Sequence, residues 1–324
     1  MTAEDSGHPA RSGVTVIGCV QADVLMSGVT DLPGPGATLL TDSMSLRVGG
    51  AGANAALAFA ETPLPVRLMG CVGDDQLGRW MREEIAGAGI ADELAVLPGL
   101  ATGLTVALQS PQRDRTFLTY LGVNLQWGPE MIPADALRTT SLLLCDYFVA
   151  PRLQGEAART LLAGARAAGA ATYFDTAFDP HGFPPATRRE VRGLLELVDV
   201  FLPNEDEARA LTGADPAGGP EVTLAAAREL QRDCGGWIVV KLGPRGCLAV
   251  GPGGQELSVA APVVQVADTT GAGDAFNAGL IVALGEGGEW PAALEAATHM
   301  ASEIIARPSD ARHRWSALNR GATG

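Results

Sequence analysis

Short apolar runs alternate with alanine-rich segments of helical periodicity along most of the chain. The apolar runs predict strands at residues 14–20, 66–73, 141–149, 171–177, 198–204 and 237–243. The segments between them predict helices at residues 52–60, 76–90, 156–169, 205–212 and 224–235. Strands that are almost continuously apolar and are separated by helices indicate a parallel sheet covered on both faces. The pattern therefore predicts an α/β protein.

Two stretches interrupt this alternation. Residues 24–48 carry PGPG followed by the alternating sequence TLLTDSMSLRV, and residues 102–121 have the pattern of two strands around the polar turn SPQRD. We expect a small antiparallel sheet that closes over a site and excludes water, although an edge hairpin would give the same pattern. The expected organisation is a disordered leader at 1–13, an α/β body at 14–23, 49–101 and 122–310, a β lid at 24–48 and 102–121, and a C-terminal tail at 311–324.

Charge and cysteine usage narrow the possible partners. The formal net charge is -14, which disfavours nucleic acid and anionic membranes as partners because both require a basic surface. No apolar run approaches the ~20 residues of a membrane span, and the polar N-terminus lacks a signal-peptide pattern. The five scattered cysteines and the four histidines show neither a disulfide framework nor a metal spacing. These features predict a cytoplasmic protein.

The stretch DTTGAGDAF at 268–276 carries the clearest chemical signal. It leads into the apolar segment DAFNAGLIVAL at 274–284, which we expect to be a buried helix. The first turn of a helix has unpaired N–H groups and a partial positive charge, and the small residues Gly271, Ala272 and Gly273 leave room for a phosphate there. Asp274 beside this anion hole can take the proton of an attacking hydroxyl. A glycine turn with Asp274 as a helix cap is the alternative interpretation.

Several other polar residues stand where a ligand could be bound. Asp146 follows a predicted strand and should point into the crevice in which α/β proteins bind ligands, whereas Asp23 alone could be a solvated loop acid. The segment GGAGAN at 49–54 allows close approach of a ligand to the backbone, and Asn54 can both donate to and accept from hydroxyl groups. Asn204 and Glu207 in PNEDEA form either a ligand pair or a capping box.

Two of these motifs resemble the signatures of one family. DTTGAGDAFNAGL is similar to the C-terminal signature of the ribokinase-like, or PfkB, carbohydrate kinases, and VGGAGANAALAFA at 48–60 to their N-terminal signature. The resemblance covers roughly residues 14 to 307. It implies a three-layer α/β/α fold with a β lid, and the ATP-dependent phosphorylation of a hydroxyl of a small sugar with Asp274 as general base.

The resemblance also implies roles for individual residues. The sugar would be bound by Asp23, Gly49, Gly50, Asn54 and Asp146. The ATP would be bound by Asn204, Lys241, Gly243, Gly246 and Gly273. Lys241, Gly243 and Gly246 belong to KLGPRG, and Gly273 belongs to GAGD. Glu207 would hold Mg²⁺ through water, and Asp268 with Thr270 would hold a possible K⁺. The chain departs from the family at Asp146, which is usually glutamate, and in ARPSDAR at 306–312, which lacks the Gly-Ala pair that completes the K⁺ site.

The substrate stays open at this stage. Ala51 stands where several ribokinase-like proteins have lysine, which favours an unphosphorylated sugar, while Arg47, Arg113 and Arg115 keep a phosphosugar possible. A nucleoside would require an aromatic stacking surface, for which the candidates are Phe117, Tyr120, Tyr147 and Phe148. A sugar-binding regulator without catalysis is the alternative from another class. Dimerisation through the exposed edges of the lid is also expected.

Overall fold

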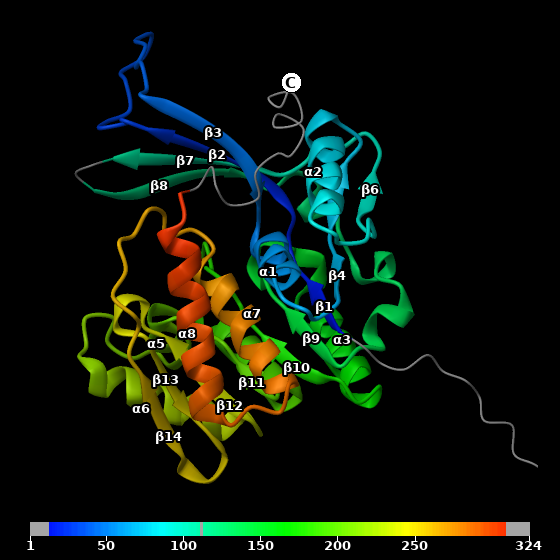
Figure 1. The fold of residues 1–324 in the computed structure, drawn as a ribbon, viewed down its shortest axis with the longest axis vertical. Helices are drawn as coiled ribbons and strands as arrows, with labels where there is room; N and C mark the ends of the chain where they lie inside the picture. Colours follow the sequence, from blue (N-terminus) through cyan, green and yellow to red (C-terminus); the bar gives the residue numbers. More distant parts are fainter. Residues whose placement is uncertain (1–12, 111–112, 309–324) are drawn as a thin grey trace, which may run out of the picture.

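An eight-stranded sheet forms the middle layer of the computed structural model, which describes residues 13–110 and 113–308 (Figure 1). Its strands, in spatial order, are β14 (Glu256–Val259), β13 (Cys247–Val250), β12 (Trp237–Lys241), β11 (Val200–Phe201), β10 (Ala171–Phe174), β9 (Ser141–Leu144), β1 (Val14–Ile17) and β4 (Val66–Met69). The pairs from β12 to β4 are parallel, and β13 and β14 are added antiparallel at one edge. The predicted α/β class is therefore confirmed.

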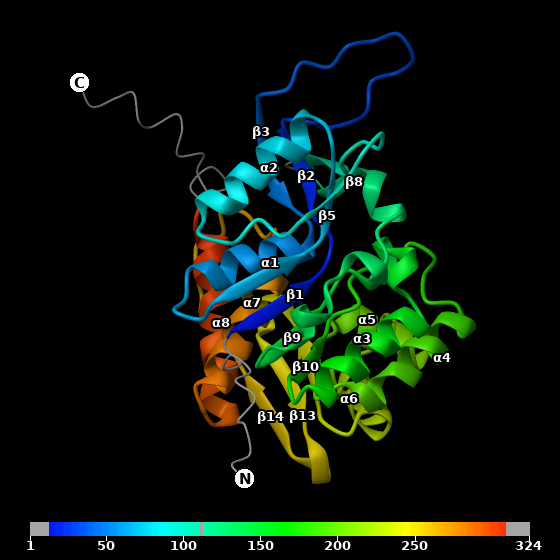
Figure 2. The ribbon, with the colours of Figure 1, turned by 90° about the vertical axis from the view of Figure 1, so that its right-hand side faces the viewer.

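Helices cover both faces of this sheet, which gives the three-layer arrangement visible in Figure 2. One face carries α1 (Ala51–Ala60), α7 (Ala272–Gly285) and α8 (Trp290–Ala306). The other carries α3 (Glu156–Ala167), α4 (Pro185–Leu194), α5 (Glu205–Thr212) and α6 (Pro220–Asp233), while α2 (Gln76–Gly87) lies near the second sheet. Strand side chains alternate between the two layers: Leu143 packs in the α1 and α7 core, whereas Leu142 and Leu144 pack in the α3 to α6 core.

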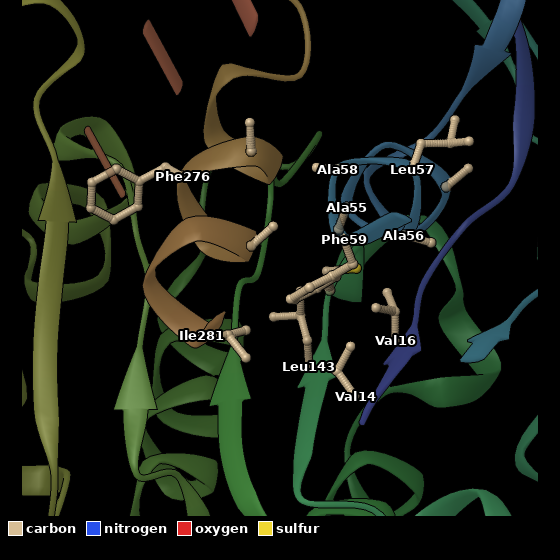
Figure 3. Packing of buried hydrophobic residues seen from close by; sticks show 14 of the residues in the cluster. Val14, Val16, Ala55, Ala56, Leu57, Ala58, Phe59, Leu143, Phe276 and Ile281 are labelled. Atoms are coloured by element: carbon tan, nitrogen blue, oxygen red, sulfur yellow. The ribbon is translucent and has the colours of Figure 1, made fainter. Parts of the chain in front are cut away.

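The α1 and α7 core explains why both glycine motifs run directly into apolar helices. Figure 3 shows Phe59 of α1 beside Leu143 of β9 and Val16 of β1, with Ile281 of α7 approaching from the neighbouring helix. Small residues let the helices come close, because a Cβ added at Gly279 would lie 3.0 Å from the Cα of Ala297 in α8. Close packing of α1 and α7 fixes the starts of both helices relative to each other.

A second, four-stranded sheet lies beyond the end of the body at which α8 finishes (Figure 1). Its order is β3 (Ser43–Gly49), β2 (Gln21–Ser27), β7 (Leu104–Ser110) and β8 (Arg113–Tyr120). We expected an antiparallel sheet, but β2 and β7 pair in parallel; the long segment from β3 through β6 (Ala95–Leu97) connects them. β2 begins at Gln21 and β3 ends at Gly49, so this part of the sheet extends beyond the expected lid segment at 24–48.

Several predicted strands are longer than the observed ones. The runs at 14–20, 141–149 and 171–177 stop pairing at Ile17, Leu144 and Phe174. The run at 198–204 forms a strand only at Val200–Phe201, with one isolated bridge between Asn204 and Lys241. The run at 66–73 divides into β4 and β5 (Cys71–Gly73). The residues that follow these strands stay buried although they leave the sheet, so apolar character continues past the last ladder hydrogen bond.

Other parts of the chain carry elements for which the sequence pattern gave no prediction. These are helices α4 and α8 and strands β6, β13 and β14. The expected leader at 1–13, apart from Gly13, and the expected tail at 311–324 lie outside the described residues. Within the described ranges, none of the helices combines the length and the apolar character that a membrane span requires.

Candidate active site

Four neighbouring strands of the main sheet deliver polar side chains to one edge. Asp146 follows β9, Asp175 follows β10, Asn204 follows β11 and Lys241 ends β12. Because these strands are parallel neighbours, their carboxyl ends meet at the same edge of the sheet, where α/β proteins bind ligands. The described structure therefore brings together residues that are far apart in the sequence.

Helix α7 begins at this edge with an open first turn. Its N-cap is Gly271, whose left-handed backbone (φ 76°) suits glycine, and no side chain caps the helix. A Cβ added at Gly271 would have nothing closer than the Asn54 side chain at 3.8 Å, so there is open space in front of the turn. The first N–H groups and the helix dipole thus face a space that an anion can enter.

Asp274 lies in the first turn of α7, beside Asn54 of α1. Burial raises the pKa of the Asp274 carboxyl well above its ordinary value, and the carboxylates of Asp175 and Asp146 raise it further. Lys241 and a hydrogen bond with Asn54 act in the opposite direction and favour the charged form. A carboxylate with a raised pKa is a better proton acceptor than an ordinary aspartate.

Lys241 supplies a positive charge under the start of α7. Its ammonium donates to Asp175 Oδ2 at 2.5 Å, and a Cβ added at Gly273 would lie 3.6 Å from its Nζ. Asn277 of α7 also donates to Asp175 Oδ2, at 2.7 Å. Burial alone would lower the pKa of Lys241, but Asp175 and Glu207 outweigh burial and raise it, so the side chain stays charged.

Asn204 and Glu207 form a complete capping box at the start of α5. The Asn204 side chain accepts from Glu207 N at 2.9 Å, and Glu207 Oε2 accepts from Asn204 N at 2.9 Å. Asn204 Nδ2 also donates to Glu207 Oε1 at 2.6 Å. Burial raises the pKa of Glu207 to about 7, and the nearby Asp175 contributes to that shift. The structural interpretation of this pair is therefore correct, and its proposed ligand role stays a prediction.

Asp23 lies in the four-stranded sheet, where it pairs in register with Arg47 of β3. Its Oδ1 is buried without a hydrogen-bond partner among the described residues, as is Oε1 of Gln21 two positions earlier. Burial raises the pKa of Asp23 to about 6, although Arg47 acts against that shift. A side chain at position 49 would displace the Asp23 carboxylate, because a Cβ there would lie 2.2 Å from Asp23 Oδ2. Two buried acceptors without partners suit a ligand rich in hydroxyl groups.

Asp146 has a structural role that the sequence did not reveal. Its Oδ2 accepts from Gly52 N and from Cys19 N, both at 3.0 Å, so it caps the start of α1 and ties it to the end of β1. Its backbone is left-handed (φ 58°), which is uncommon for a residue with a side chain and is found mainly at constrained sites. Burial raises the pKa of this carboxyl to about 6. Contact with a sugar stays a prediction for Asp146 and for Gly50.

A largely apolar cavity of about 440 Å³ opens on the other side of Lys241 and Gly273. Its walls come from the turn between β12 and β13, from segment 261–266 and from the facing sides of α7 and α8; they include Gly243, Gly246, Val263, Val264, Phe276, Ala301 and Ile305. Gly246 is required by its backbone (φ 91°), since a Cβ there would lie 1.9 Å from Val259 O. The cavity is of the size that small-molecule ligands occupy.

Asp268 and Thr270 lie together in the loop before α7. Asp268 Oδ1 accepts from Thr270 N and from Thr270 Oγ1, both at 2.9 Å, and Oδ2 accepts from Arg47 Nη1 at 2.9 Å. The same guanidinium approaches Asp23 Oδ2 at 3.7 Å. Arg47 therefore joins the lid to the loop that leads into the anion hole.

Sequence reasoning missed or underrated three residues of the site. Asp175, in YFDTA at the end of the predicted strand 171–177, is a weaker candidate than Asp146 from the sequence alone, yet it accepts a hydrogen bond from Lys241. Asn277 could have been found as the one polar residue in the apolar run after Asp274, and Gln21 as a polar neighbour of Asp23. The side chains of Arg113 and Arg115 lie outside the described residues.

An uncapped helix start with Asp274 and Lys241 beside it, at the carboxyl edge of a three-layer α/β fold, is an arrangement that suits phosphoryl transfer. The family model described as pfkB family carbohydrate kinase matches residues 14–316, and the chain belongs to this family. It is a kinase that acts on a sugar hydroxyl.

Individual relatives agree with this assignment. The chain is 28% identical to the ribokinase of Haemophilus influenzae over 277 residues, which is 85% of this chain and 86% of that protein. It is 30% identical to the deoxyribokinase of Salmonella typhimurium over 264 residues, covering 81% and 82% of the two chains. The structure of Arabidopsis thaliana ribokinase complexed with ribose and ATP is similar at a TM-score of 0.78 and 26% identity, over 91% of this chain and 93% of that one.

Proposed function

We propose that this kinase transfers the γ-phosphoryl group of ATP to a hydroxyl of a small unphosphorylated sugar, with Asp274 as general base. The observation that carries the proposal is the position of Asp274 in an uncapped first helical turn, with the ammonium of Lys241 close behind Gly273. A hydroxyl next to Asp274 loses its proton to the carboxylate as it attacks the phosphorus in line.

The same turn stabilises the charge that develops during transfer. The N–H groups of Gly271, Gly273 and Asp274 donate to the phosphoryl oxygens, whereas that of Ala272 already donates to Thr269 O at 3.3 Å; Lys241 supplies a fixed positive charge beside them. Both groups are in place before the substrates bind, because α7 is packed against α1 and Lys241 is held by Asp175. Such preorganised donors lower the barrier without any rearrangement at the moment of reaction.

The ATP would lie in the apolar cavity between α7, α8 and the turn after β12. Gly243, Gly246, Lys241 and Gly273 all line this cavity. The apolar walls suit a base, and the side with Lys241 and Gly273 suits the phosphates. A relative of similar structure, the ribokinase of Arabidopsis thaliana, was solved with ribose and ATP, which supports the same pair of ligands here.

Mg²⁺ fits this site as a hydrated ion that arrives with the nucleotide. Among the described residues no cluster of three or more histidine, cysteine or acidic side chains could form a cage for it. Asp175 and Glu207 lie near Lys241, and both oxygens of Glu207 already accept from Asn204, which suits contact through water. When bound, the ion would neutralise phosphate charge.

The lid residues favour an unphosphorylated acceptor. The terminal nitrogens of Arg47 face Asp268 and Asp23, which balance its charge, while its Nε is buried without a hydrogen-bond partner among the described residues. Asp23 Oδ1 and Gln21 Oε1 are buried acceptors that hydroxyl groups can satisfy. Asn54 reaches the same region from α1, beside Asp274.

A nucleoside is the second candidate acceptor because one aromatic residue is suitably placed. Phe117 is exposed and shares the Asp23 face of the lid, since it pairs with Ala107 two positions from Thr105, the partner of Asp23. Tyr120 lies on the opposite face, and Tyr147 is buried with its hydroxyl bonded to Glu190 and Gly155 N. Phe148 packs edge-on against Tyr147 and Phe183.

A second copy of this chain is the partner that we propose for the lid. Cross-strand register places an uncharged row on the face opposite Asp23, and it includes Met44, Leu46, Leu118 and Tyr120. Met44 and Leu46 of β3 are 65% and 43% exposed, and Leu118 and Tyr120 of β8 are 53% and 58% exposed, so apolar side chains are exposed at both edges of this face. Sedimentation analysis should give twice the mass of one chain.

We place the enzyme in the cytoplasm because its five cysteines are all free and buried.

The test measures ADP release with Mg-ATP and a panel of free sugars, phosphosugars and nucleosides. Wild type should turn over one class, and Asp274→Asn should keep ligand binding but lose about 10²–10⁴-fold in rate. Asp92→Asn, at an exposed aspartate paired with Arg82, is the matched control and should behave as wild type. Near-normal turnover by Asp274→Asn would refute the role of this carboxylate. A wild type that binds sugar and ATP without turnover would instead indicate a sugar-binding regulator.

A further inference from the structure

The ion pair between Arg47 and Asp268 connects two parts of the site that are 221 residues apart in the chain. Arg47 belongs to β3 of the lid, and Asp268 lies three residues before Gly271, the N-cap of α7. The Asp268 side chain is 2% exposed and that of Arg47 13%, so solvent screens this pair only weakly. Such a pair holds its two elements in one relative position.

Asp268 in turn shapes the loop around the anion hole. Its Oδ1 accepts from both the backbone and the hydroxyl of Thr270, and its own N–H donates to Ile305 O near the end of α8. Ala267 N donates to the same carbonyl. The carboxylate therefore fixes residues 268–270, which set the direction in which Gly271 starts the helix.

A monovalent cation does not fit this arrangement. An ion of the K⁺ type needs several oxygen ligands that replace its hydration shell. At Asp268 one carboxylate oxygen accepts two hydrogen bonds from Thr270, and the other faces a guanidinium at 2.9 Å. A cation bound there would also be repelled by the charge of Arg47.

We propose that the Arg47 guanidinium acts as a built-in cation, which holds the loop at 268–271 in its working geometry and makes the enzyme independent of added K⁺. The inference rests on the proposed function, in which this loop presents the anion hole. Arg47 also lines a small hollow together with Asn54, Thr270 and Gly271, so its charge lies close to the groups that it positions. Arg47 is thus a positioning residue and does not itself touch the reacting atoms.

The experiment compares wild type, Arg47→Met, Asp268→Asn and the double variant in tetramethylammonium chloride and in KCl of equal ionic strength. Calorimetric affinity for Mg-ADP is measured together with turnover. For wild type we expect the same affinity and the same rate in both salts. Arg47→Met should lose about 10²-fold in rate in tetramethylammonium, because the hole is misplaced, and should recover part of it in KCl or with guanidinium ion.

Further variants separate positioning from folding. Arg47→Lys retains a charge at this position and should fall between wild type and Arg47→Met. Arg228→Met removes an exposed arginine from its pair with Glu256 and should change neither affinity nor rate. In the double variant the response to KCl should disappear, since no carboxylate is left to attract the ion.

Two results would overturn the inference: a wild type whose Mg-ADP affinity or rate requires KCl, or an Arg47→Met variant that matches wild type in tetramethylammonium. If wild type shows no turnover with any acceptor, the proposed function fails. The affinity data then still decide the role of Arg47, because they report the geometry of the loop without any reaction.

Discussion

Two helices start at the same edge of the main sheet, and their first turns differ in one respect. In α5 the first turn is closed, because Asn204 and Glu207 satisfy each other's backbone N–H groups. In α7 the first turn is open, because Gly271 has no side chain with which to cap it. A missing cap costs a helix about 1 kcal/mol, so the open turn is less stable than a capped one.

The difference indicates how the fold divides stability and function. Helix α7 tolerates an uncapped start because its apolar faces are packed between α1 and α8. Helix α5 is shorter, with 8 residues against 14, and relies more on its capping box. The N–H groups left open at α7 are therefore available to phosphate, whereas those at α5 are largely engaged. The predictions below test this division, beginning with the largest effect.

The largest effect should come from the charge beneath the open turn. In Lys241→Met the phosphates lose a fixed positive charge beside Gly273, and turnover should fall by about 10²–10³-fold, as when an anion-hole donor is removed. Steady-state kinetics with saturating sugar and ATP measures this loss.

A double variant separates catalysis from folding in this experiment. Lys241→Met alone leaves Asp175 buried without its ion-pair partner, which destabilises the protein. Adding Asp175→Asn removes that charge and should restore stability in a thermal melt. Turnover should stay low, and a double variant as active as wild type would show that Lys241 serves only to neutralise Asp175.

Local patterns in the sequence were sufficient to predict the α/β class and the apolar helices that follow both glycine motifs, while the role of Asp274 stays a prediction. Periodicity and runs of small residues are properties of neighbouring positions, so they can be read without the fold. Strand ends were placed too late because Cys145 and Tyr147 are buried although β9 ends at Leu144. An apolar sequence indicates that residues are buried, but it does not indicate where the hydrogen bonds between strands stop. The two end at different residues.

Pairing between distant residues could not be predicted. Nothing near Arg47 in the sequence indicates that it meets Asp268, and nothing near Asp175 indicates Lys241. Asp146 shows the same limit, because its strand-end position predicted a ligand contact, while the fold uses one of its oxygens to cap α1. Both Asp146 and Asp175 follow a strand of the main sheet, yet Asp146 caps helix α1 while Asp175 holds Lys241.

A smaller effect concerns Asp23, whose pKa is raised to about 6 by burial. In the unfolded chain this group titrates near 3.8, so ionisation destabilises the folded state, and stability falls as pH rises from about 4 through about 6. Asp23→Asn should therefore be more stable than wild type near pH 7.5, by at most about 3 kcal/mol. Denaturant unfolding should show this gain shrinking as pH is lowered toward 4.

The same substitution should weaken the sugar site, which links the raised pKa to function. Ionised Asp23 accepts from hydroxyl groups, so the KM for the sugar should rise in wild type as pH falls below about 6. In Asp23→Asn the KM should be high at every pH. A variant that gains stability and keeps the wild-type KM would remove Asp23 from the site.

The smallest effect should come from the closed turn of α5. Asn204→Ala removes the acceptor for Glu207 N and should lower the free energy of unfolding by about 1 kcal/mol, measured by urea denaturation. Asp75 is the N-cap of α2, and its side chain accepts from Gly78 N. Asp75→Ala removes this cap and should cost at least as much stability as Asn204→Ala. If Asn204 also contacts the nucleotide, only Asn204→Ala should raise the KM for ATP. An equal KM for ATP in both variants would restrict Asn204 to its capping role, and the contrast between the closed and open turns would then be complete.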